Sequence, residues 1–472
     1  MLKIKAFILN LLIISDILKL NNIARGSLSM KKYDYIILGS GPVAIHLLAK
    51  LERTTNKVLL IEKGLWGGTC PNTGCQPKIF MEGTVRPVLN SYYLAGKGIK
   101  EAAKIDWPTL MARKKKIWAA FHRNERKSMT SEHTDTVQGK GVITGPHTVK
   151  VGDQEYEGKN IVIGTGLAPR DLDVPGNEYA ITNNEFFDLD KLPKRAIVIG
   201  GGYVAMELAT ILQAAGAEVT ILQHSDRLLR PFDQEMVGTL KRIMEDRGIK
   251  FHLNAPVKEI AKDGDQYTVT TENGDTFDTD LVINAAGRKP NVEGIGLEDV
   301  GIEFDPNKGI KVNEHMQTNI PSIFAAGDVA DNGQPSLTPV AWVDAYHIIN
   351  FVENGITDPI QYPPVATNAF TYPEIAQVGI CEDEMEEGDY IKTLDLSDMF
   401  FSMGEGDSHA KLKVILNKNG EVRGASELSI HAAEDINNFV PLVGRKDPKK
   451  FVEENLTFAF PTPANNLDTL FR

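Results

Sequence analysis

The chain has 472 residues, of which 42% are hydrophobic and 24% charged, and its net charge at pH 7 is −12. It is too long for one ordinary hydrophobic core, so we expect two or three domains with the composition of a soluble globular protein. The negative charge argues against general nucleic-acid binding, which needs a basic face to neutralise phosphates. Three cysteines cannot build a disulfide-rich scaffold, and no nearby cluster of Cys or His completes a zinc site, so we expect no bound metal.

Residues 1–29 differ from the rest of the chain. Two lysines precede an apolar run that resembles a signal or anchor, but Asp16 interrupts the run, and no cleavage site of the A-x-A type follows. The run is also too short to cross a bilayer, so a membrane partner is not expected. We interpret the segment as an upstream mis-assigned start or a disordered extension, with a peripheral membrane helix as the alternative. Met30 then begins an ordinary cytosolic domain, which predicts a cytoplasmic protein.

The first motif is the stretch "YDYIILGSGPVAIHLLAKL", which predicts a strand, a glycine turn and a helix. Gly39, Gly41 and Ala44 occupy the G-x-G-x-x-G/A frame of a dinucleotide site. Glu62 ends the next strand roughly twenty residues on, where an acid accepts hydrogen bonds from a ribose diol. The glycines allow a pyrophosphate to approach the positive end of the helix.

The same pattern returns in "RAIVIGGGYVAMELATILQAAGAEVTILQ", with Gly200, Gly202 and Ala205 in the same frame. The chain therefore carries two dinucleotide modules. Two dinucleotides in one polypeptide indicate electron transfer between them, and NAD(P)H with a flavin is the obvious pair.

Three further glycine-containing turns follow strands and are candidate cofactor contacts. Gly327-Asp328 is one of them; its acid can bond polyol hydroxyls, although a simple Asx-type turn is the alternative. From about Tyr346 the glycine turns stop, and alternating strands such as "HAKLKVILN" and "VRGASELSI" predict a separate α+β domain. The residues assigned to these turns are Thr165, Gly166, Gly287, Arg288, Gly327 and Asp328.

Cys70 and Cys75 lie in "GLWGGTCPNTGCQPKIF". Their spacing alone leaves two interpretations open, a redox pair or two inert buried thiols. Cys381 has no partner nearby in the sequence and is read as an ordinary thiol.

Several blocks together resemble the FAD-dependent pyridine nucleotide–disulfide oxidoreductases, the group of glutathione reductase, lipoamide dehydrogenase and mercuric reductase. They are "GGTCPNTGCQP", "AAGDVA", "LTPVA" and "FTYPEIAQVG", and the resemblance runs from Met30 to Thr462. It implies that Cys75 is the charge-transfer thiol beside the flavin and that Cys70 is the interchange thiol that meets the substrate. Gly68 and Thr69 precede this pair and would also contact the cofactor.

Within the family, "CQPKI" is closer to the glutathione reductase pattern than to the lipoamide pattern. The resemblance implies that Lys78 sits at the flavin N5 edge and pairs with Glu207, where a cation would stabilise negative charge on reduced flavin. It also implies that Tyr203 covers the nicotinamide site. An exposed Lys, a helix-surface Glu and a packed Tyr are the plain alternatives.

The end of the second strand of the second module bears on the choice of nicotinamide. NAD sites place an acid there and NADP sites use Arg, whereas this chain has Gln223. His224, Arg227 and Arg230 could hold a 2′-phosphate, although a solvated basic turn explains them equally well. We expect NADPH in preference to NADH.

The C-terminus departs from the family. Phe460 and Asn465 stand where the family has the His and Glu of its His-Pro-Thr-x-x-Glu motif, and phenylalanine cannot shuttle a proton. The arginines that hold the carboxylates of glutathione align with Leu47, Leu48 and Tyr346, which disfavours glutathione as substrate.

The predicted fold is α/β: two Rossmann-like dinucleotide-binding domains, one inserted in the other, and a C-terminal α+β dimerisation domain. The segment "SELSIHAAEDINNFV", with His431 and Glu434, resembles the interface of the family homodimer. The predicted boundaries are residues 30–152 and 283–345 for FAD, 153–282 for NAD(P) and 346–472 for dimerisation.

The predicted function is passage of electrons from NAD(P)H through FAD and a Cys70–Cys75 disulfide to a small-molecule acceptor of the disulfide type. The alternative is a quinone, metal ion, oxygen or carbon electrophile reduced in a proton-poor site, which Phe460 favours. A non-enzymatic redox-sensing flavoprotein is the third hypothesis.

Overall fold

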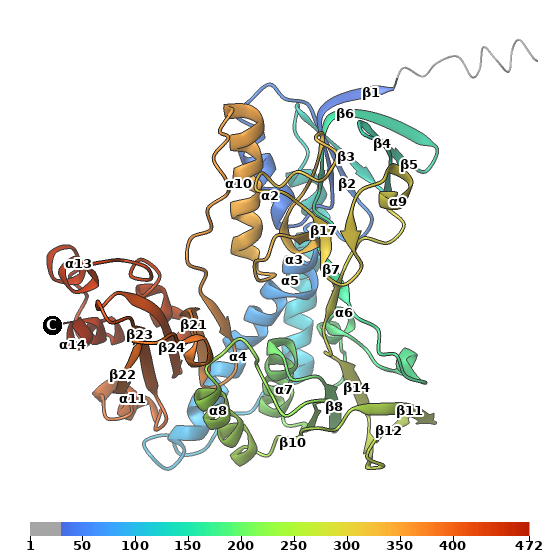
Figure 1. Ribbon diagram of the computed structural model, residues 1–472. Helices are drawn as coiled ribbons and strands as arrows, with labels where there is room; N and C mark the ends of the chain where they lie inside the picture. The colour runs from blue at the N-terminus through green and yellow to red at the C-terminus, as the bar shows by residue number, and fades with distance from the viewer. Residues whose placement is uncertain (1–29, 472) are drawn as a thin grey trace, which may run out of the picture.

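The computed structural model describes residues 30–471, in three units joined by long helices (Figure 1). The extension predicted for residues 1–29 lies outside the described residues. Among the residues that the structure describes, no helix is both long and apolar enough to cross a membrane.

The first unit is built on a seven-stranded sheet whose centre is a set of parallel strands. Strand β1 pairs in parallel with β2 and with β6, and the last four residues of β1 are fully or almost fully buried, as expected for a parallel strand covered on both faces. The strands are β1 (Lys31–Leu38), β2 (Val58–Glu62), β3 (Thr134–Gln138), β4 (Gly141–Gly145), β5 (Thr148–Val151), β6 (Gln154–Ile163) and β18 (Ile323–Ala325).

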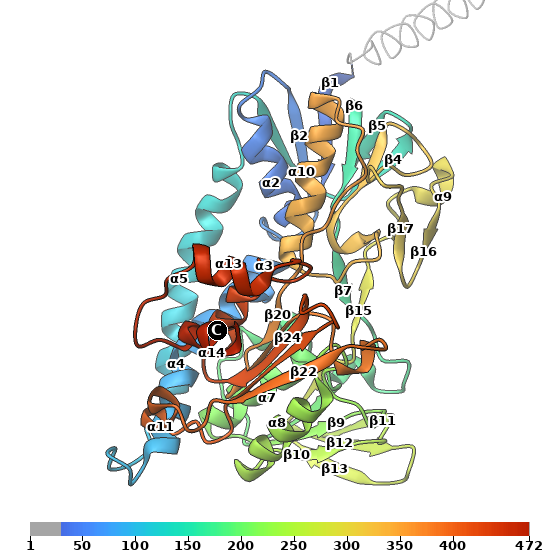
Figure 2. The same cartoon turned by 60° about the vertical axis from the view of Figure 1, so that its left-hand side comes forward.

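Two helices lie side by side on one face of this sheet (Figures 1 and 2). They are α2 (Pro42–Leu51), which follows the first glycine turn, and α10 (Thr338–Asn354), which comes back from the end of the unit. Their buried sides share one apolar core with the strands of the sheet.

The second unit contains a four-stranded parallel sheet and an antiparallel sheet of three strands. The parallel sheet comprises β8 (Arg195–Ile199), β9 (Glu218–Leu222), β10 (Lys250–His252) and β14 (Leu281–Asn284), with helices α7 (Tyr203–Ala215) and α8 (Gln234–Asp246). The antiparallel sheet comprises β11 (Val257–Asp263), β12 (Gln266–Thr271) and β13 (Thr276–Thr279).

The strand pairing corrects the predicted domain boundaries. Strand β6 pairs with β1 along most of its length, so residues 154–163 belong to the first sheet and not to the second unit that was predicted to begin at residue 153. Strand β14 pairs with β8, so the second unit runs to Asn284 and the predicted boundary at residue 283 divides a strand. The two chain segments that connect these units pair with each other as short antiparallel strands, β7 (Leu167–Pro169) and β15 (Arg288–Pro290).

The third unit is a five-stranded antiparallel sheet with helices, which confirms the α+β pattern read from its sequence. Its strands are β20 (Thr367–Ala369), β21 (Glu374–Gly379), β22 (Tyr390–Asp395), β23 (Lys411–Leu416) and β24 (Val422–Ser429). Its helices are α11 (Phe400–Glu405), α12 (Ala432–Asp435), α13 (Pro448–Asn455) and α14 (Asn466–Phe471). The predicted mixed α/β class with two nucleotide-binding units and a C-terminal domain is therefore observed.

Helices near the middle of the molecule connect the three units. The short α3 (Thr69–Thr73) is followed by α4 (Cys75–Leu94), which Figure 2 shows descending beside α5 (Trp107–Ser128) from the first unit towards the other two. One apolar cluster contains residues of α4, α5, α7 and β21, so the helix that begins at Cys75 is anchored in both lower units. The remaining elements are α6 (Asn183–Phe186), α9 (Leu297–Val300), β16 (Phe304–Asp305), β17 (Gly309–Lys311) and β19 (Ala330–Asp331).

Candidate active site

The first glycine turn has room for a phosphate above the start of α2. Gly39 has φ +97°, and a Cβ there would lie 2.4 Å from the carbonyl oxygen of Gly164, so only glycine fits. A Cβ on Gly41 would meet nothing within 4 Å, and Gly41 begins α2 without a side-chain cap. The open space therefore faces uncapped helix N–H groups, which suit the pyrophosphate of a dinucleotide.

Glu62, at the end of β2, is held in place by the same turn. One carboxylate oxygen accepts hydrogen bonds from the backbone nitrogen of Ser40 at 2.9 Å and from its hydroxyl at 2.7 Å. The other accepts from the backbone nitrogen of Gly64 at 2.6 Å. Sequence reasoning did not assign Ser40, whose hydroxyl also accepts from the backbone nitrogen of Gly67 at 2.9 Å and so ties the turn to the segment before the cysteines.

The second glycine turn repeats this arrangement at the start of α7. A Cβ on Gly200, which has φ +128°, would lie 2.3 Å from the carbonyl oxygen of Ala285, whereas one on Gly202 would meet nothing within 4 Å. No side chain caps α7. Tyr203 is the first residue of α7 and 37% of it is exposed; burial of its hydroxyl raises its pKa. The two turns thus fit two dinucleotides.

The side chain of Gln223 holds the turn after β9 together by hydrogen bonds. Its side-chain nitrogen donates to the hydroxyl of Ser225 at 2.9 Å and to the carbonyl oxygen of Arg227 at 3.1 Å. Arg227 forms an ion pair with Asp383 of the third unit. His224, Asp226 and Arg230 are the exposed residues of the turn.

Cys70 and Cys75 are brought together by two helices. Cys70 lies in α3, Cys75 is the first residue of α4, and both are free thiols. Gly74 separates the helices, and a Cβ there would lie 3.1 Å from the carbonyl oxygen of Thr69, so a side chain would be crowded. The Thr338 hydroxyl, at the start of α10, lowers the pKa of both thiols, an effect smaller than that of the two thiols on each other.

The two thiols differ in acidity. The hydrogen bond from Cys70, with smaller contributions from the charge of Lys78 and the Thr338 hydroxyl, lowers the pKa of Cys75 to about 6. The hydrogen bond with Cys75 and burial raise the pKa of Cys70. At neutral pH the pair therefore holds one proton, and Cys75 carries the thiolate.

Lys78 and Glu207 form an ion pair about one helical turn along α4 from Cys75. The Lys78 Nζ lies 2.8 Å from Oε1 of Glu207, and Glu207 is 3% exposed. The backbone nitrogen of Phe370 donates to the same oxygen at 3.0 Å, and the ammonium lies 4.5 Å from the centre of the Phe370 ring. A fixed positive charge beside the thiolate can stabilise negative charge that develops there.

Arg288 connects the second unit to the cysteine segment. Its guanidinium donates to the carbonyl oxygen of Leu167 at 2.7 Å and to the hydroxyl of Thr69 at 3.4 Å. Burial lowers the pKa of Arg288. Burial also raises the pKa of Asp328, and the positive charge of Arg288 offsets part of this increase.

The other residues predicted in the glycine turns stabilise or shape the backbone of those turns. Thr165 donates its hydroxyl to the carbonyl oxygen of Asn291 at 2.9 Å, and Gly166 has φ +65°. Gly287 has φ +125°, and a Cβ there would meet nothing within 4 Å. Gly68, with φ +69°, lies against the first glycine turn, where a Cβ would be 3.0 Å from the Cα of Gly41.

Sequence reasoning missed three side chains of this region. Thr338 is one; its signal was its position in the "LTPVA" block at a helix start. Asp344 is fully buried and accepts from the backbone nitrogen of Gly327 at 2.8 Å; an acid on the apolar side of α10 was the available signal. Glu82, one turn beyond Lys78 on α4, is 7% exposed, has no partner for its Oε2, and has a pKa raised by burial.

Phe460 is not brought to the cysteines of its own chain. It lies between α13 and α14, and 86% of its side chain is exposed. The neighbouring Asn465 accepts a hydrogen bond from the backbone nitrogen of Thr462 at 3.1 Å.

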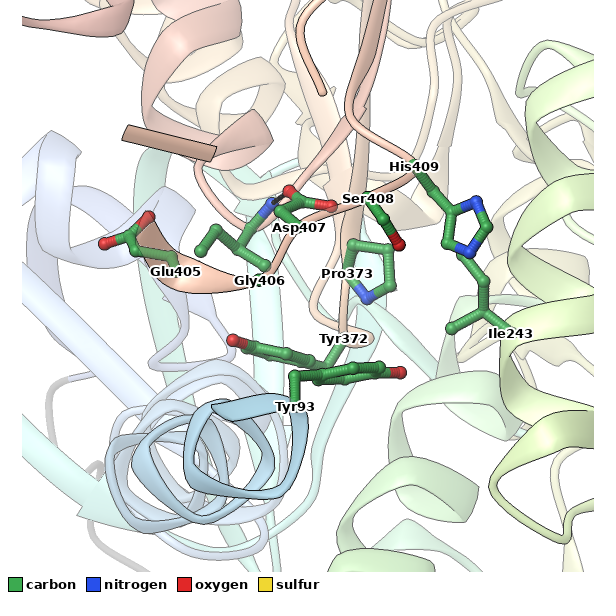
Figure 3. A pocket seen from close by; sticks show the side chains of 10 residues that line it. Tyr93, Ile243, Tyr372, Pro373, Glu405, Gly406, Asp407, Ser408 and His409 are labelled. Atoms are coloured by element: carbon green, nitrogen blue, oxygen red, sulfur yellow. Dashed lines mark hydrogen bonds between the residues drawn. The ribbon is translucent and has the colours of Figure 1, made fainter. Parts of the chain in front are cut away.

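A separate small cavity lies where the third unit meets α4 and α8 (Figure 3). Tyr93 and Tyr372 form its floor, with ring centres 5.7 Å apart. Glu405, Asp407 and His409 face it from the third unit. Its volume is about 10 Å³, which is room for about one water molecule and too small for a substrate.

The chain matches known proteins over nearly its whole length. The model of the family described as pyridine nucleotide-disulphide oxidoreductase matches residues 33–345. Glutathione reductase of Burkholderia cepacia is 30% identical over 458 residues, which cover 93% of this chain and 99% of that protein. Mercuric reductase of Lysinibacillus sphaericus is 30% identical over 389 residues, covering 80% of this chain and 70% of that protein.

A solved structure shares the fold. The copper(II) complex of the HOCl-induced flavoprotein disulfide reductase RclA from Escherichia coli superposes with a TM-score of 0.84 at 24% identity, covering 94% of this chain and 99% of that one.

Two glycine turns, each at the start of a helix without a side-chain cap, have the geometry that suits dinucleotides. The chain is an enzyme of the pyridine nucleotide-disulphide oxidoreductase family. Membership of this family implies FAD and a pyridine nucleotide as cofactors.

Proposed function

We propose that this enzyme uses NAD(P)H and FAD to reduce a Cys70–Cys75 disulfide, and that the resulting dithiol reduces a small acceptor of the disulfide type. The observation that carries the proposal is the position of Cys75 at the start of α4, beside Cys70 and about one helical turn from the Lys78–Glu207 ion pair, with its pKa lowered to about 6. A dithiol that shares one proton in this way is prepared for thiol–disulfide exchange.

The chain's own residues divide the work of the exchange. Cys75 holds the negative charge, which Lys78 and Thr338 stabilise, and Cys70 holds the proton. Bound FAD would supply the chemistry of accepting a hydride and releasing an electron pair to sulfur. We assign the first glycine turn and Glu62 to FAD, and the second turn with Tyr203 to the nicotinamide cofactor.

We further propose NADPH as the electron donor, because the turn after β9 has no acid at Gln223 and exposes His224 and Arg230. Glutathione remains a poor candidate for the acceptor, since Leu47 and Leu48 are 0% and 5% exposed and offer no charge to a carboxylate. A cytoplasmic homodimer is the expected form, in which Phe460 would reach the cysteines of the second copy.

The test is an anaerobic titration of FAD-loaded protein with NADPH. We expect a long-wavelength absorbance band from the thiolate beside the oxidised flavin, and its loss in the Cys70→Ser/Cys75→Ser variant. If that variant retains full turnover of every acceptor, the proposed electron route is wrong.

A second candidate keeps both cofactors and replaces the disulfide acceptor by a metal ion, quinone, oxygen or carbon electrophile. It is favoured by Phe460 in place of a proton-carrying His, and by the similarity to a protein named mercuric reductase. Phe460→His discriminates the two. It should raise disulfide turnover if the acceptor is a disulfide, and leave turnover of the true acceptor unchanged or lower under the second candidate.

A further inference from the structure

The segment between the two cysteines is held from outside by hydrogen bonds. Four residues separate Cys70 from Cys75, and a disulfide between the two would close this segment into a small ring. Asn72, which is 6% exposed, lies within this ring segment. Its side-chain nitrogen donates to the carbonyl oxygens of Trp66 at 2.8 Å and of Gly68 at 2.7 Å. Both amide protons are therefore used, and the side-chain oxygen is left to accept.

His122 of helix α5 is the donor to that oxygen. Its Nε2 lies 2.8 Å from Oδ1 of Asn72. Turning the amide over would place its oxygen against the two carbonyl oxygens, so the orientation of the Asn72 side chain is fixed. Since Oδ1 has no proton to give, Nε2 of His122 carries the proton of this hydrogen bond. His122 itself is exposed, whereas the oxygen that it holds belongs to a buried residue.

Two other side chains hold the backbone of the ring segment. Trp118, one turn earlier on α5, donates its indole N–H to the carbonyl oxygen of Pro71 at 2.7 Å. Trp118 is 8% exposed, and its ring packs edge-on against Phe80 of α4 with centres 5.5 Å apart. Asn183 of α6 donates to the carbonyl oxygen of Thr73 at 2.7 Å. Three successive positions of the ring segment are thus held, the first and third by their backbone and the middle one by its side chain.

We propose that His122 is a positioning residue of the redox pair: by holding Asn72 it keeps the ring segment ordered in the dithiol, so that the two sulfurs join at a low cost in chain entropy. This inference rests on the proposed function, because it concerns the Cys70–Cys75 disulfide. In the dithiol no covalent bond crosses the segment, and the hydrogen bonds from outside restrict its backbone. In the disulfide the S–S bond restricts the backbone as well. Loss of the His122 hydrogen bond therefore releases more freedom in the dithiol than in the disulfide.

The direction and size of the effect follow from this difference. Without the His122 hydrogen bond the dithiol should be favoured, because closure of the ring would then have to order the segment. A hydrogen bond of ordinary strength corresponds to a change of about fivefold in the equilibrium constant between disulfide and dithiol, which for this two-electron couple is about 20 mV towards easier reduction.

The test is a redox titration of the FAD-loaded enzyme, without nicotinamide, in buffers of reduced and oxidised dithiothreitol. As the ring closes, the cysteine pair loses two electrons and its one proton and forms an S–S bond. The S–S bond of oxidised dithiothreitol breaks, and this reagent takes up the two electrons, that proton and one proton from the buffer. Alkylation of the remaining thiols and mass spectrometry of the peptide give the fraction of disulfide. We expect His122→Ala to lower the ratio of disulfide to dithiol about fivefold relative to wild type.

Two amide replacements separate the hydrogen bond from the bulk of the imidazole. In His122→Gln the amide nitrogen lies as many bonds from the backbone as Nε2 does, so this variant should restore the wild-type ratio to within about twofold. In His122→Asn the amide nitrogen takes the place of Nδ1 and falls short of Asn72, so this variant should behave as His122→Ala does. The control is His133→Ala, which removes a ring that pairs with Glu132 and should leave the ratio unchanged.

A double-mutant cycle tests whether His122 acts through Asn72. If it does, adding His122→Ala to Asn72→Ala should cause no further change in the ratio. Asn72 is buried, and should its alanine variant fail to fold, the contrast between His122→Gln and His122→Asn still decides.

Other results overturn the inference. An equal ratio in wild type, His122→Ala and His122→Asn, even with a lower melting temperature in the variants, would show that His122 supports the fold and not the redox pair. Additive changes in the cycle would show that His122 acts through another contact. Both results leave the proposed electron route intact, because wild type would still form the disulfide. A wild type that forms no Cys70–Cys75 disulfide in any of the buffers would reject the proposed function, and this inference with it.

Discussion

Glu207 of α7 holds Lys78 of α4 at 2.8 Å, although 129 positions separate them in the chain. The pair joins the second unit to the helix that starts at Cys75. The ion pair therefore fixes the side chain of Lys78 through a carboxylate from another unit.

Glu207→Gln should destabilise the fold. The substitution leaves the Lys78 ammonium, whose side chain is 17% exposed, without its partner, and breaking such a buried pair costs about 2–4 kcal/mol. Urea unfolding measures the loss. The matched control is Glu245→Gln in the surface pair with Lys241, which should cost under about 0.5 kcal/mol. Equal losses in the two variants would contradict a structural role for the buried pair.

The acidity of Cys75 predicts its reaction with iodoacetamide. Only the thiolate reacts, so alkylation of Cys75 in the reduced protein should rise with pH through a midpoint at about 6 and level off above it. Because the hydrogen bond from Cys70 is the main cause of the shift, Cys70→Ala should move the midpoint towards the ordinary thiol value of about 8.5. Mass spectrometry of the labelled peptide follows the reaction. An unmoved midpoint in Cys70→Ala would rule out this cause.

Two alanine variants separate folding from cofactor binding in the first glycine turn. Gly39→Ala places a Cβ 2.4 Å from a backbone oxygen at φ +97°, and should lower the free energy of unfolding by about 2 kcal/mol or more. Gly41→Ala meets no protein atom within 4 Å, so the protein without cofactor should keep its stability. The added methyl group instead fills the space assigned to the pyrophosphate, so the purified protein should contain much less FAD.

Thermal unfolding of the cofactor-free protein and the flavin absorbance of the purified protein give the two readouts. A normal FAD content in Gly41→Ala would contradict the assignment of this turn. Loss of stability in both variants to the same extent would contradict a steric clash specific to Gly39.

Periodicity and spacing were sufficient for much of the architecture. The glycine frames predicted both βαβ units, because the turn they require leaves few alternatives, and the alternating strands of the third unit were recognised from their period of two. The boundary at residue 153 was wrong because a strand that returns to its own sheet has the same apolar pattern as one that starts a new sheet. Only the partner strand distinguishes them.

The site was predictable where a motif fixes the spacing and not where the fold brings distant residues together. Cys70 and Cys75 stand in one signature, whereas Thr338, which lowers the pKa of both thiols, belongs to a helix more than 250 positions later in the chain, and its own motif does not show which residues it faces. Asp344 and Glu82 are acids on helices, and their burial depends on which helix face is covered. The sequence alone does not show which face of a helix is covered by other helices or strands.

Glu427 gives a pH-dependent prediction in the third unit. Burial, with the nearby charge of Asp435, raises the pKa of Glu427 to about 8, while Ser429 donates a hydrogen bond to it at 2.6 Å. The unfolded chain ionises this group at about 4.3, so between pH 4.3 and 8 the folded state holds the extra proton and stability falls as pH rises. Glu427→Gln keeps the shape without the charge, and should be more stable than wild type at pH 8 by about 1–3 kcal/mol, with little difference at pH 5.

Urea unfolding at the two pH values measures the effect, with Glu387→Gln at an exposed position as the control. The control should follow the wild-type curve at both pH values, because its side chain is exposed. A Glu427→Gln variant that loses stability equally at pH 5 and pH 8 would show that the carboxyl is needed for its hydrogen bonds and that its ionisation is not what limits stability at high pH.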